Sequence, residues 1–434
     1  MRTRGSVESL VPAQGGSYDV VVAGGGMAGL GAAMAAAQNQ ARTLLLEAES
    51  YFGGVAAVTF WMPINRLLLD GGPRGGVVDL FVDIIRHQGP EAYTDGKEDS
   101  ICGDGLDVHP DYLKLAIFEA LETAGVHYRL YSPVTDVLLD GDAVTGVVVS
   151  GKSGRQTFHA KVVVDATGDG DVACLAGAEV MEGREEDGRH MPVSLTFALA
   201  HVGVDRFLAF LENERTAFEQ AISEARDRGY CTAEWYDFDR TTVPGVLSVN
   251  NGGAADMGNV DGTDPRHLTI AERMGIQVAV DFVRLAREAR LPGLEACCLI
   301  GTGARVGVRD TRRVVGEYVF TVDDARTGPQ FPDVVARKYG AIDACQIFIG
   351  EMESGHGYPY RCLLPKGVDN LLVAGRCGSA TFLGLAAGKS MGNMMEVGQA
   401  AGVAAALCSA QDLTPRDIDV AQVQDVLRSM GVKL

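Results

Sequence analysis

The sequence predicts an α/β protein with a Rossmann-like nucleotide-binding domain of parallel strands, and two observations support that prediction. Residues 18–23 form a valine-rich run typical of a buried parallel strand, and the run leads directly into a glycine-rich turn at residues 24–29. An alanine-rich helix follows, and a second strand over residues 43–46 ends at Glu47. Strand, glycines, helix, strand and acid in this order make a complete βαβ unit for a dinucleotide.

Each part of this unit has a physical task. Gly24 permits the tight turn, Gly26 allows the backbone to approach a pyrophosphate, and Gly29 allows helix and strand to pack closely. The N-terminus of the helix offers free N–H groups and the positive end of a dipole to the phosphates. Glu47 lies where an acid binds ribose hydroxyls, which favours FAD or NAD over NADP.

The remaining elements predict two domains. Helices are expected at about residues 78–87 and 111–124, and strands at 127–130, 134–139, 144–149 and 161–165. A segment with a different sequence pattern follows, and we expect helices in it at 205–228 and from Asp264-Pro265 to about 290. A strand at 370–375 and a helix at 391–407 then return to the first domain. We therefore expect a nucleotide-binding domain at 17–189 and 346–434, an inserted α+β substrate (cap) domain at 190–345, and a flexible tail at 1–16.

Composition excludes several classes of protein. The chain has 434 residues and a formal net charge of −19, which disfavours binding to nucleic acid. Residues 1–16 lack the apolar core of a signal peptide, and Lys389 and Glu396 interrupt the longest apolar run, so we expect a cytoplasmic protein without membrane contact. The nine cysteines are scattered without a CxxC pair, so no metal site is expected.

A search for a second nucleotide fingerprint fails. The segment from Gly301 to Gly307 has one residue too many before its last glycine, and the charged residues 308–313 follow it. If the single site holds FAD, the flavin performs the redox chemistry and the protein orients it.

Several further segments resemble one family of flavoproteins. They are Ala166-Thr167-Gly168-Asp169-Gly170-Asp171 after a buried strand, Phe52-Gly53-Gly54, and residues 308–317, 359–367, 370–377 and 398–402. Together they resemble the FAD-dependent oxidoreductase family of the glutathione-reductase-like superfamily, from about Tyr18 to Cys408. The resemblance implies an FAD-binding domain of the GR2 type, FAD as cofactor, and a possible homodimer.

The resemblance also implies which residues contact FAD. The final helix would aim its N-terminus at the flavin O2 and N1 edge, where a positive dipole end stabilises the reduced flavin. Arg376 stands where many members of the wider superfamily have an acid. The implied FAD-binding residues are Gly24, Gly26, Met27, Ala28, Gly29, Glu47, Ala48, Gly53, Gly54, Val134, Ala166, Thr167, Gly168, Gly375, Arg376, Gly388, Met391, Gly392 and Asn393.

Three residues are candidates for catalysis. His356 lies just before the chain re-enters the FAD-binding domain, where a histidine can take the proton from a substrate hydroxyl. Arg309 can hold a substrate anion, or belong with Arg312 and Arg313 to a set of salt bridges between domains. Lys389 can stabilise flavin N1 or bind substrate, or be a solvated lysine at a helix start.

Other residues are candidates for contact with substrate. Trp61 and Asn65, with Met62 between them, follow Gly54 and either line a pocket over the flavin ring or pack in the core. Tyr358 is a third candidate, two residues after His356. His109, before Pro110, is expected to start a helix, and the Cys297-Cys298 pair to pack in a strand.

The sequence leaves three functions open. The first is an FAD-dependent dehydrogenase or oxidase that passes a hydride from a small, hydroxylated or carboxylated substrate to flavin N5, with an unidentified electron acceptor. The alternative is a flavin monooxygenase or C=C reductase supplied by NAD(P)H. A halogenase is disfavoured because Phe60-Trp61-Met62-Pro63-Ile64 lacks paired tryptophans and a matching lysine. The third is a non-catalytic flavin-binding protein.

Overall fold

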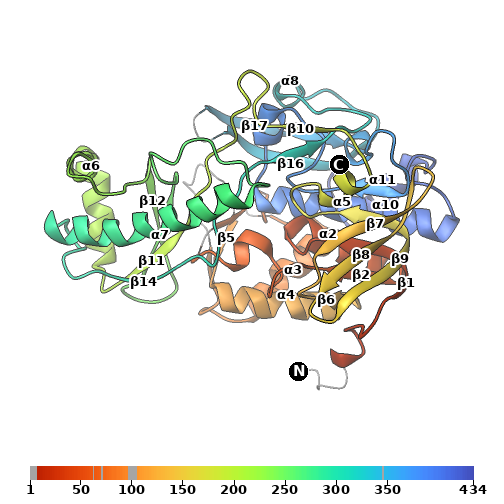
Figure 1. The fold of residues 1–434 in the computed structure, drawn as a ribbon, viewed down its shortest axis with the longest axis horizontal. Coiled ribbons are helices and arrows are strands. Elements are labelled where there is room, and N and C mark those ends of the chain that lie inside the picture. The colour runs from red at the N-terminus through yellow and green to blue at the C-terminus, as the bar shows by residue number, and fades with distance from the viewer. Residues whose placement is uncertain (1–6, 62, 70–71, 96–104, 345–346) are drawn as a thin grey trace.

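A seven-stranded sheet forms the centre of the molecule. The computed structural model describes residues 7–61, 63–69, 72–95, 105–344 and 347–434. The sheet order is β6-β2-β1-β9-β8-β7, and β18 pairs with the end of β9 (Figure 1). Its strands are β1 (Gly16–Ala23), β2 (Thr43–Leu46), β6 (His127–Arg129), β7 (Val134–Asp140), β8 (Ala143–Gly151), β9 (Gly154–Asp165) and β18 (Leu371–Val373).

The parallel part of this sheet confirms the predicted fold class. β1 runs parallel to β2 on one side and to β9 on the other, and β2 runs parallel to β6. Val20, Val21 and Val22 of β1 are completely buried, as expected for a strand that is covered on both faces. β7 and β8 add an antiparallel hairpin to the edge.

Five helices complete the nucleotide-binding part. The hydrophobic core on their side of the sheet contains residues of all five. α4 starts after His109, whose Nδ1 accepts the N–H of Asp111 at 3.2 Å, and this confirms the predicted helix start. The helices are α2 (Met27–Gln38), α3 (Gly76–His87), α4 (Pro110–Ala124), α10 (Met391–Gln411) and α11 (Val420–Ser429).

α2 and α10 pack unusually close together because small residues line their contact. A Cβ atom at Gly398 would lie 1.9 Å from the carbonyl oxygen of Ala28, and one at Gly402 would lie 2.1 Å from that of Ala32. A Cβ at Gly31 would in turn lie 2.1 Å from the carbonyl oxygen of Met395. The two helix axes can approach this closely only because these glycines lack a side chain.

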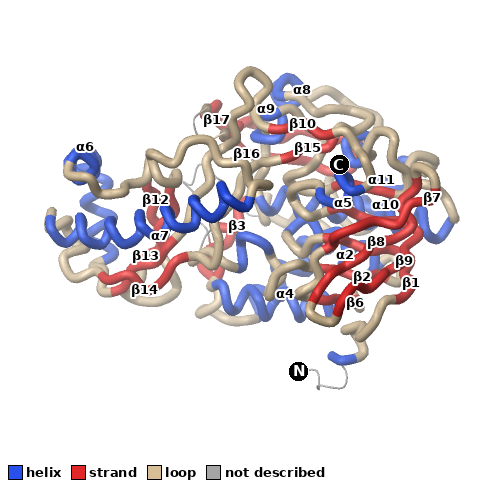
Figure 2. The backbone as a smooth tube through the Cα atoms, in the orientation of Figure 1, coloured by secondary structure: helices blue, strands red, loops and turns tan. Residues whose placement is uncertain are grey.

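A second unit lies at the opposite end of the molecule and has a hydrophobic core of its own. Its antiparallel sheet has the order β12-β13-β11-β14, and its core is rich in aromatic rings such as Phe207, Phe218, Phe238 and Phe282. Figure 2 shows the strands of this unit apart from those of the parallel sheet. The unit contains β11 (Phe197–Ala200), α6 (Val204–Asp227), β12 (Tyr236–Arg240), β13 (Leu247–Asn251), α7 (Pro265–Glu288) and β14 (Cys298–Thr302).

A third group of elements covers the parallel sheet near the start of α10. Buried residues from Phe320 to Leu364 share one core with α2 and α10. The predicted division of the chain at residue 345 stays a prediction, and this shared core favours placing 320–344 with the nucleotide-binding part. The group contains β10 (Val180–Glu182), β15 (Arg312–Val314), α8 (Val322–Thr327), β16 (Val334–Asp343), β17 (Phe348–Pro359) and α9 (Phe382–Ala386).

Short elements join these units. Of the cysteines in the described part of the chain, seven are free thiols, and Cys298 lies in β14 as predicted. No helix in the described part of the chain is long and apolar enough to cross a bilayer. The short elements are η1 (Gly54–Ala57), β3 (Pro63–Asn65), β4 (Tyr93–Asp95), β5 (Gly105–Val108), α5 (Asp171–Leu175) and η2 (Tyr360–Leu363).

Candidate active site

The glycine-rich turn after β1 meets two other loops. Gly25 N donates to Glu47 Oε2 at 2.6 Å, and Gly53 N donates to the carbonyl oxygen of Gly25 at 2.7 Å. A Cβ at Gly54 would lie 3.3 Å from Gly26 Cα. The acid at the end of β2 therefore holds the glycine-rich turn directly, and residues 53 and 54 border the same turn.

The turn leaves an open face in front of α2. No heavy atom lies within 4 Å of the position that a Cβ at Gly26 would occupy, whereas a Cβ at Gly29 would lie 1.8 Å from the carbonyl oxygen of Gly24. No side chain caps α2, so the N–H groups of Met27 and Ala28 are not used by a capping side chain. These are the features that a pyrophosphate needs.

The residues just before β7 lie beside the same acid. Ser132 N donates to the carbonyl oxygen of Glu47 at 2.8 Å, which places the start of β7 at Val134 next to Glu47 and Ala48. The predicted adenosine contacts of Val134 and Ala48 thus fall at the same edge of the sheet as the glycine-rich turn.

Two further predicted segments converge on this edge. Ala166 N donates to the carbonyl oxygen of Ala23 at 2.8 Å, and Thr167 follows it. A Cβ at Gly168 would lie 2.7 Å from Arg376 Nη2, and one at Gly375 would lie 3.2 Å from the Cβ of Ala28.

The guanidinium of Arg376 is used within the protein. Its Nη1 donates to Asp169 Oδ1 at 3.0 Å. Burial opposes ionisation of Asp169, but the charges and hydrogen bonds of Arg376 and Thr311 outweigh burial and lower its pKa. Arg376 therefore links the end of β18 to the segment that follows β9.

α10 begins with unsatisfied polar groups. Ser390 is its N-cap residue but makes no capping bond, and its Oγ is buried without a partner among the described residues. Met391 is the first helical residue, and a Cβ at Gly392 would lie 2.1 Å from the carbonyl oxygen of Arg66. No capping side chain therefore uses the backbone N–H groups of this first turn.

The side chain of Asn393 is committed to the protein. Its Nδ2 donates to the carbonyl oxygens of Tyr339 at 2.7 Å and Gly388 at 3.1 Å, and its Oδ1 accepts from Tyr339 N at 3.3 Å. Asn393 is completely buried. The predicted contacts of Gly388 and Asn393 with a cofactor stay a prediction.

These features fit FAD. The open turn at Gly26 and the uncapped α2 suit its pyrophosphate, and the uncapped α10 with the unpartnered Ser390 Oγ suits the polar edge of its flavin ring.

A cluster of buried basic and aromatic side chains lies beside the segment that leads into α10. We call Lys338, His356, Tyr358 and Phe320 the basic cluster. Lys338 and His356 are register partners on β16 and β17. His356 stacks on Phe320 with ring centroids 5.2 Å apart, and Lys338 Nζ lies 5.4 Å from the Phe320 centroid and 4.8 Å from that of Tyr358.

Close contacts connect the basic cluster to residues 375–388. A Cβ at Gly388 would lie 3.0 Å from Lys338 Cβ, and one at Gly378 would lie 2.9 Å from Tyr358 Oη. Phe320 N donates to the carbonyl oxygen of Ser379 at 3.1 Å. The cluster therefore packs against the stretch between the predicted FAD contacts Gly375 and Met391.

Burial changes the ionisation of the basic cluster. Desolvation, reinforced by the nearby charges of Lys338 and Arg337, lowers the pKa of His356 to about 3. Desolvation also lowers the pKa of Lys338 to about 8, and it raises the pKa of Tyr358. At neutral pH the imidazole is therefore uncharged, and the ammonium of Lys338 is mostly protonated.

The other two catalytic candidates are engaged elsewhere. Arg309 Nη1 donates to the carbonyl oxygen of Pro192 at 2.8 Å and to Ser194 Oγ at 3.2 Å. Lys389 Nζ pairs with Asp343 Oδ2 at 3.1 Å. Both side chains thus connect segments of the protein.

The neighbours of Arg309 make similar connections. Arg312 Nε donates to the carbonyl oxygen of Asp169 at 2.8 Å. Arg313 is completely buried, and it donates to the carbonyl oxygens of Ala380 at 2.9 Å and Gly183 at 2.7 Å. These contacts favour the alternative in which the arginines join segments of the fold.

Trp61 lies between the nucleotide-binding part and the second unit. Its ring contacts His109 with centroids 4.6 Å apart, and its Nε1 donates to Thr242 Oγ1 at 3.1 Å. Asn65 in β3 has a buried Oδ1 without a partner among the described residues. Met62 lies outside the described residues.

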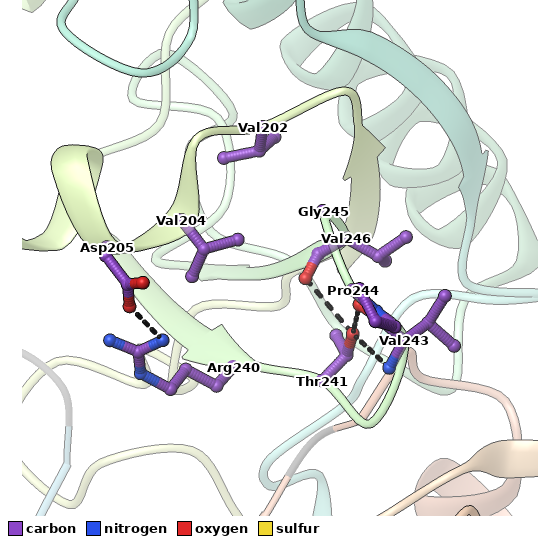
Figure 3. Close-up of a pocket in the computed structure, with 9 residues that line it drawn as sticks. All are labelled: Val202, Val204, Asp205, Arg240, Thr241, Val243, Pro244, Gly245 and Val246. Carbon is purple, nitrogen blue, oxygen red and sulfur yellow. Dashed lines mark hydrogen bonds and ion pairs between the residues drawn. The ribbon is translucent and has the colours of Figure 1, made fainter.

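A hollow of about 360 Å³ lies on the cap next to Thr242, between the start of α6 and the turn after β12. Figure 3 shows that its polar groups satisfy one another. Asp205 pairs with Arg240 at 2.7 Å, and Thr241 Oγ1 donates to the carbonyl oxygens of Val243 and Val246, each at 3.0 Å. The polar side chains of this hollow thus pair with one another or with backbone carbonyl oxygens.

Sequence reasoning missed two buried cations, Lys338 and Arg74. Arg74 is 1% exposed and contacts Glu396, Asn393 and the carbonyl oxygen of Arg66. Lys338 falls in the alternating burial pattern of β16, on the same inward face as Ala336. Burial alternates along residues 334–343, but the residue types there do not mark Lys338 as the inward one, and nothing local in the sequence distinguishes Arg74 either.

The structure resembles solved flavoenzymes in fold. The myxobacterial chondrochloren halogenase CndH matches with a TM-score of 0.52 and 14% identity, over 95% of this chain and 79% of that chain. The flavin-dependent brominase Bmp2 matches with a TM-score of 0.50 and 15% identity, over 95% and 83% of the two chains. At these identities the two likenesses show a shared fold alone.

Two comparisons of the sequence identify relatives of the chain. Thiamine thiazole synthase of Methanococcus maripaludis is 32% identical over 163 residues, which are 35% of this chain and 55% of that protein, so the match spans only about half of the curated relative. The model of a family described as FAD dependent oxidoreductase matches residues 19–427. The resemblance, the FAD cofactor and the enzymatic nature predicted from the sequence are thereby confirmed: the chain belongs to the FAD-dependent oxidoreductase family.

Proposed function

We propose that the enzyme is a dehydrogenase or oxidase that converts a hydroxyl-bearing carbon of a small polar molecule into a carbonyl. One observation carries the proposal. His356 is 1% exposed, both of its ring nitrogens lack a partner among the described residues, and it lies beside the segment that leads into α10. A buried imidazole without partners is costly unless a ligand completes its hydrogen bonds.

The reaction balances as follows. Bound FAD would supply the acceptor for the hydride of the substrate C–H bond and its two electrons, and dioxygen or an external electron acceptor would reoxidise it. His356 accepts the proton of the substrate hydroxyl, and the carbon–oxygen bond becomes double.

The same proposal assigns the cofactor contacts. The turn at Gly24 and Gly26 and the first turn of α2 hold the pyrophosphate, and Glu47 binds the ribose of the adenosine. Gly375 and the first turn of α10 at Met391 and Gly392 would hold the flavin half of the cofactor. Arg309 and Lys389 receive no step, because their cationic groups are bound to other parts of the protein.

An anaerobic titration tests the function. The FAD-loaded protein is mixed with small 2-hydroxy acids and polyols, and separately with NADH and NADPH, while the flavin absorbance is followed. We expect a hydroxylated compound to bleach the flavin without a nicotinamide. If only NADH or NADPH bleaches it, the proposal is wrong and the monooxygenase or reductase alternative replaces it.

A matched pair of variants tests the role of His356. We expect His356→Gln to slow flavin reduction by about 10²-fold or more, the usual contribution of a general base, without loss of bound FAD. His159→Gln changes an exposed histidine of β9 and serves as the control, with unchanged reduction. Equal rates in the two variants would remove His356 from the mechanism.

A further inference from the structure

Lys338 carries a buried positive charge that no described side chain balances with an ion pair. Lys338 is 2% exposed, and its Nζ lies over the rings of Phe320 and Tyr358. Within the described residues, Nζ has neither a hydrogen bond nor an ion pair. Aromatic faces attract a cation, but they do not replace the hydration that an ammonium loses on burial.

Acids near this part of the fold already have partners. Glu396 of α10 pairs with Arg74 and accepts Arg337 N at 2.8 Å. Asp343, at the end of β16, pairs with Lys389.

Asp333, which directly precedes β16, is also paired. Asp333 accepts from Arg361 Nε at 2.9 Å. None of these three carboxylates pairs with Lys338.

His356 adds unused hydrogen-bonding capacity at the same place. Register partners on neighbouring strands project to the same face of a sheet, so Lys338 and His356 point the same way, and both contact Phe320. Neither ring nitrogen of His356 has a partner among the described residues. An ammonium and an imidazole with unused hydrogen-bonding capacity thus lie against the same buried ring, that of Phe320.

From this geometry we propose that Lys338 and His356 bind the carboxylate of the substrate, so that the substrate is a small hydroxylated monocarboxylate. The inference rests on the proposed function, which it deepens by naming the substrate class. A carboxylate supplies one negative charge to one ammonium, and its second oxygen accepts from the imidazole. A phosphate would bring up to two charges against one cation and leave part of its charge buried without a partner.

The charge of the bound carboxylate also affects His356. The ammonium of Lys338 is the second cause, after burial, of the lowered pKa of His356. A carboxylate at Lys338 offsets that cause, so His356 becomes a better proton acceptor only when substrate is present.

Binding of simple probes tests the carboxylate site without any turnover. Acetate and its neutral counterpart acetamide are titrated into the FAD-loaded protein at constant ionic strength, and binding is followed by flavin difference spectra and by the melting temperature. We expect acetate to bind and acetamide to bind at least about tenfold more weakly, because a charge-assisted hydrogen bond contributes this much or more.

Three variants identify the residues. Lys338→Met and His356→Asn should each weaken acetate binding about tenfold or more, while Lys366→Met, which changes an exposed lysine, should leave it unchanged. If Lys338→Met does not fold, His356→Asn alone decides. Acetate binding of wild-type strength in either folded site variant, or no acetate binding to the wild type, overturns the proposal.

A flavin potential measurement separates another source of negative charge. The reduced flavin can itself be anionic, and Lys338 could balance that charge instead. A lower midpoint potential in Lys338→Met together with unchanged acetate affinity overturns the carboxylate site. Acetate binding that depends on Lys338, in a protein whose flavin no hydroxylated compound reduces, supports the site and refutes the proposed function.

Discussion

Replacement of Arg74 by methionine tests how the first turn of α10 is held in place. Arg74 is 1% exposed and donates to Glu396, to Asn393 and, through Nε at 2.6 Å, to the carbonyl oxygen of Arg66. Arg74→Met keeps most of the volume but removes every one of these donors. Glu396, 2% exposed, then retains Arg337 N at 2.8 Å as its partner.

The expected loss follows from the burial of both partners. Removing one partner of a buried ion pair costs about 3–5 kcal/mol, because the remaining charge is left uncompensated. A typical domain has a free energy of unfolding of about 5–15 kcal/mol, so this loss is a large part of the total. The double variant Arg74→Met/Glu396→Gln removes the orphaned charge, and it should recover about 2 kcal/mol of the loss.

The loss should also depend on pH. Burial raises the pKa of Glu396 even though Arg74 opposes it, and without Arg74 the pKa rises further. A group with a raised pKa in the folded state favours folding below its unfolded pKa and loses that contribution as the pH rises through the folded pKa. The difference between wild type and Arg74→Met should therefore shrink as the pH falls from 8 toward 5.

Urea unfolding of the apoprotein measures all three variants. Arg428→Met, in an exposed ion pair with Asp425 on α11, is the control and should cost less than about 1 kcal/mol. The reasoning is refuted if Arg74→Met costs no more than Arg428→Met, or if the double variant is less stable than Arg74→Met alone.

Three further predictions concern the site and the packing around it. Lys338→Met should raise the free energy of unfolding at pH 7 by up to about 3 kcal/mol, because burial lowers the Lys338 pKa from 10.5 to about 8. The gain should vanish as the pH rises through 8 toward 10.5. Urea unfolding at several pH values measures it, and a variant less stable than the wild type at pH 7 would contradict the prediction. Gly398→Ala should lower the free energy of unfolding by about 2 kcal/mol or more, although alanine has the better helix propensity, because its Cβ would lie 1.9 Å from the carbonyl oxygen of Ala28. An unchanged melting temperature would argue against this close contact. Glu47→Ala should weaken FAD binding about tenfold or more, because it frees Gly25 N and removes the ribose partner; reconstitution of the apoprotein followed by flavin fluorescence measures this, and wild-type affinity would exclude the role.

The nucleotide-binding half could be predicted because its signals are local. The valine run of β1, the three glycines and the acid at Glu47 lie within 30 residues of one another and appear in the structure as one βαβ unit. The start of α4 after His109 is equally local. In each case one short segment contains both the residues and the reason for their conformation.

The buried charges could not be predicted in the same way. Arg74 meets Glu396 across more than 300 residues of sequence, and only the folded chain brings them together. Lys338 sits in a stretch with Arg337 and Tyr339 that reads as a solvated charge pattern. Its burial depends on β17 and on the segment at Phe320, neither of which is adjacent in sequence.

The contacts that Arg309 and Lys389 make within the protein show a second limit of prediction from sequence. Charged residues near a predicted site are natural candidates for substrate binding, yet both satisfy donors or acceptors of the protein itself. Residue type and position along the chain cannot distinguish a cation that joins two segments from one that is free for a ligand. That distinction needs the list of partners of each charged atom.

Arg74 and Lys338 make this distinction within one region of the fold. Both are buried against α10 or the segment that precedes it, but Arg74 is matched by a carboxylate, an amide and carbonyl oxygens, whereas Lys338 faces only aromatic rings within the described part of the chain. A fold that needed only a structural contact at Lys338 would be more stable with methionine there. A negatively charged ligand therefore explains the unbalanced lysine better than a structural role does. The explanation can be tested because the buried ammonium of Lys338 should lower the stability of the unliganded protein.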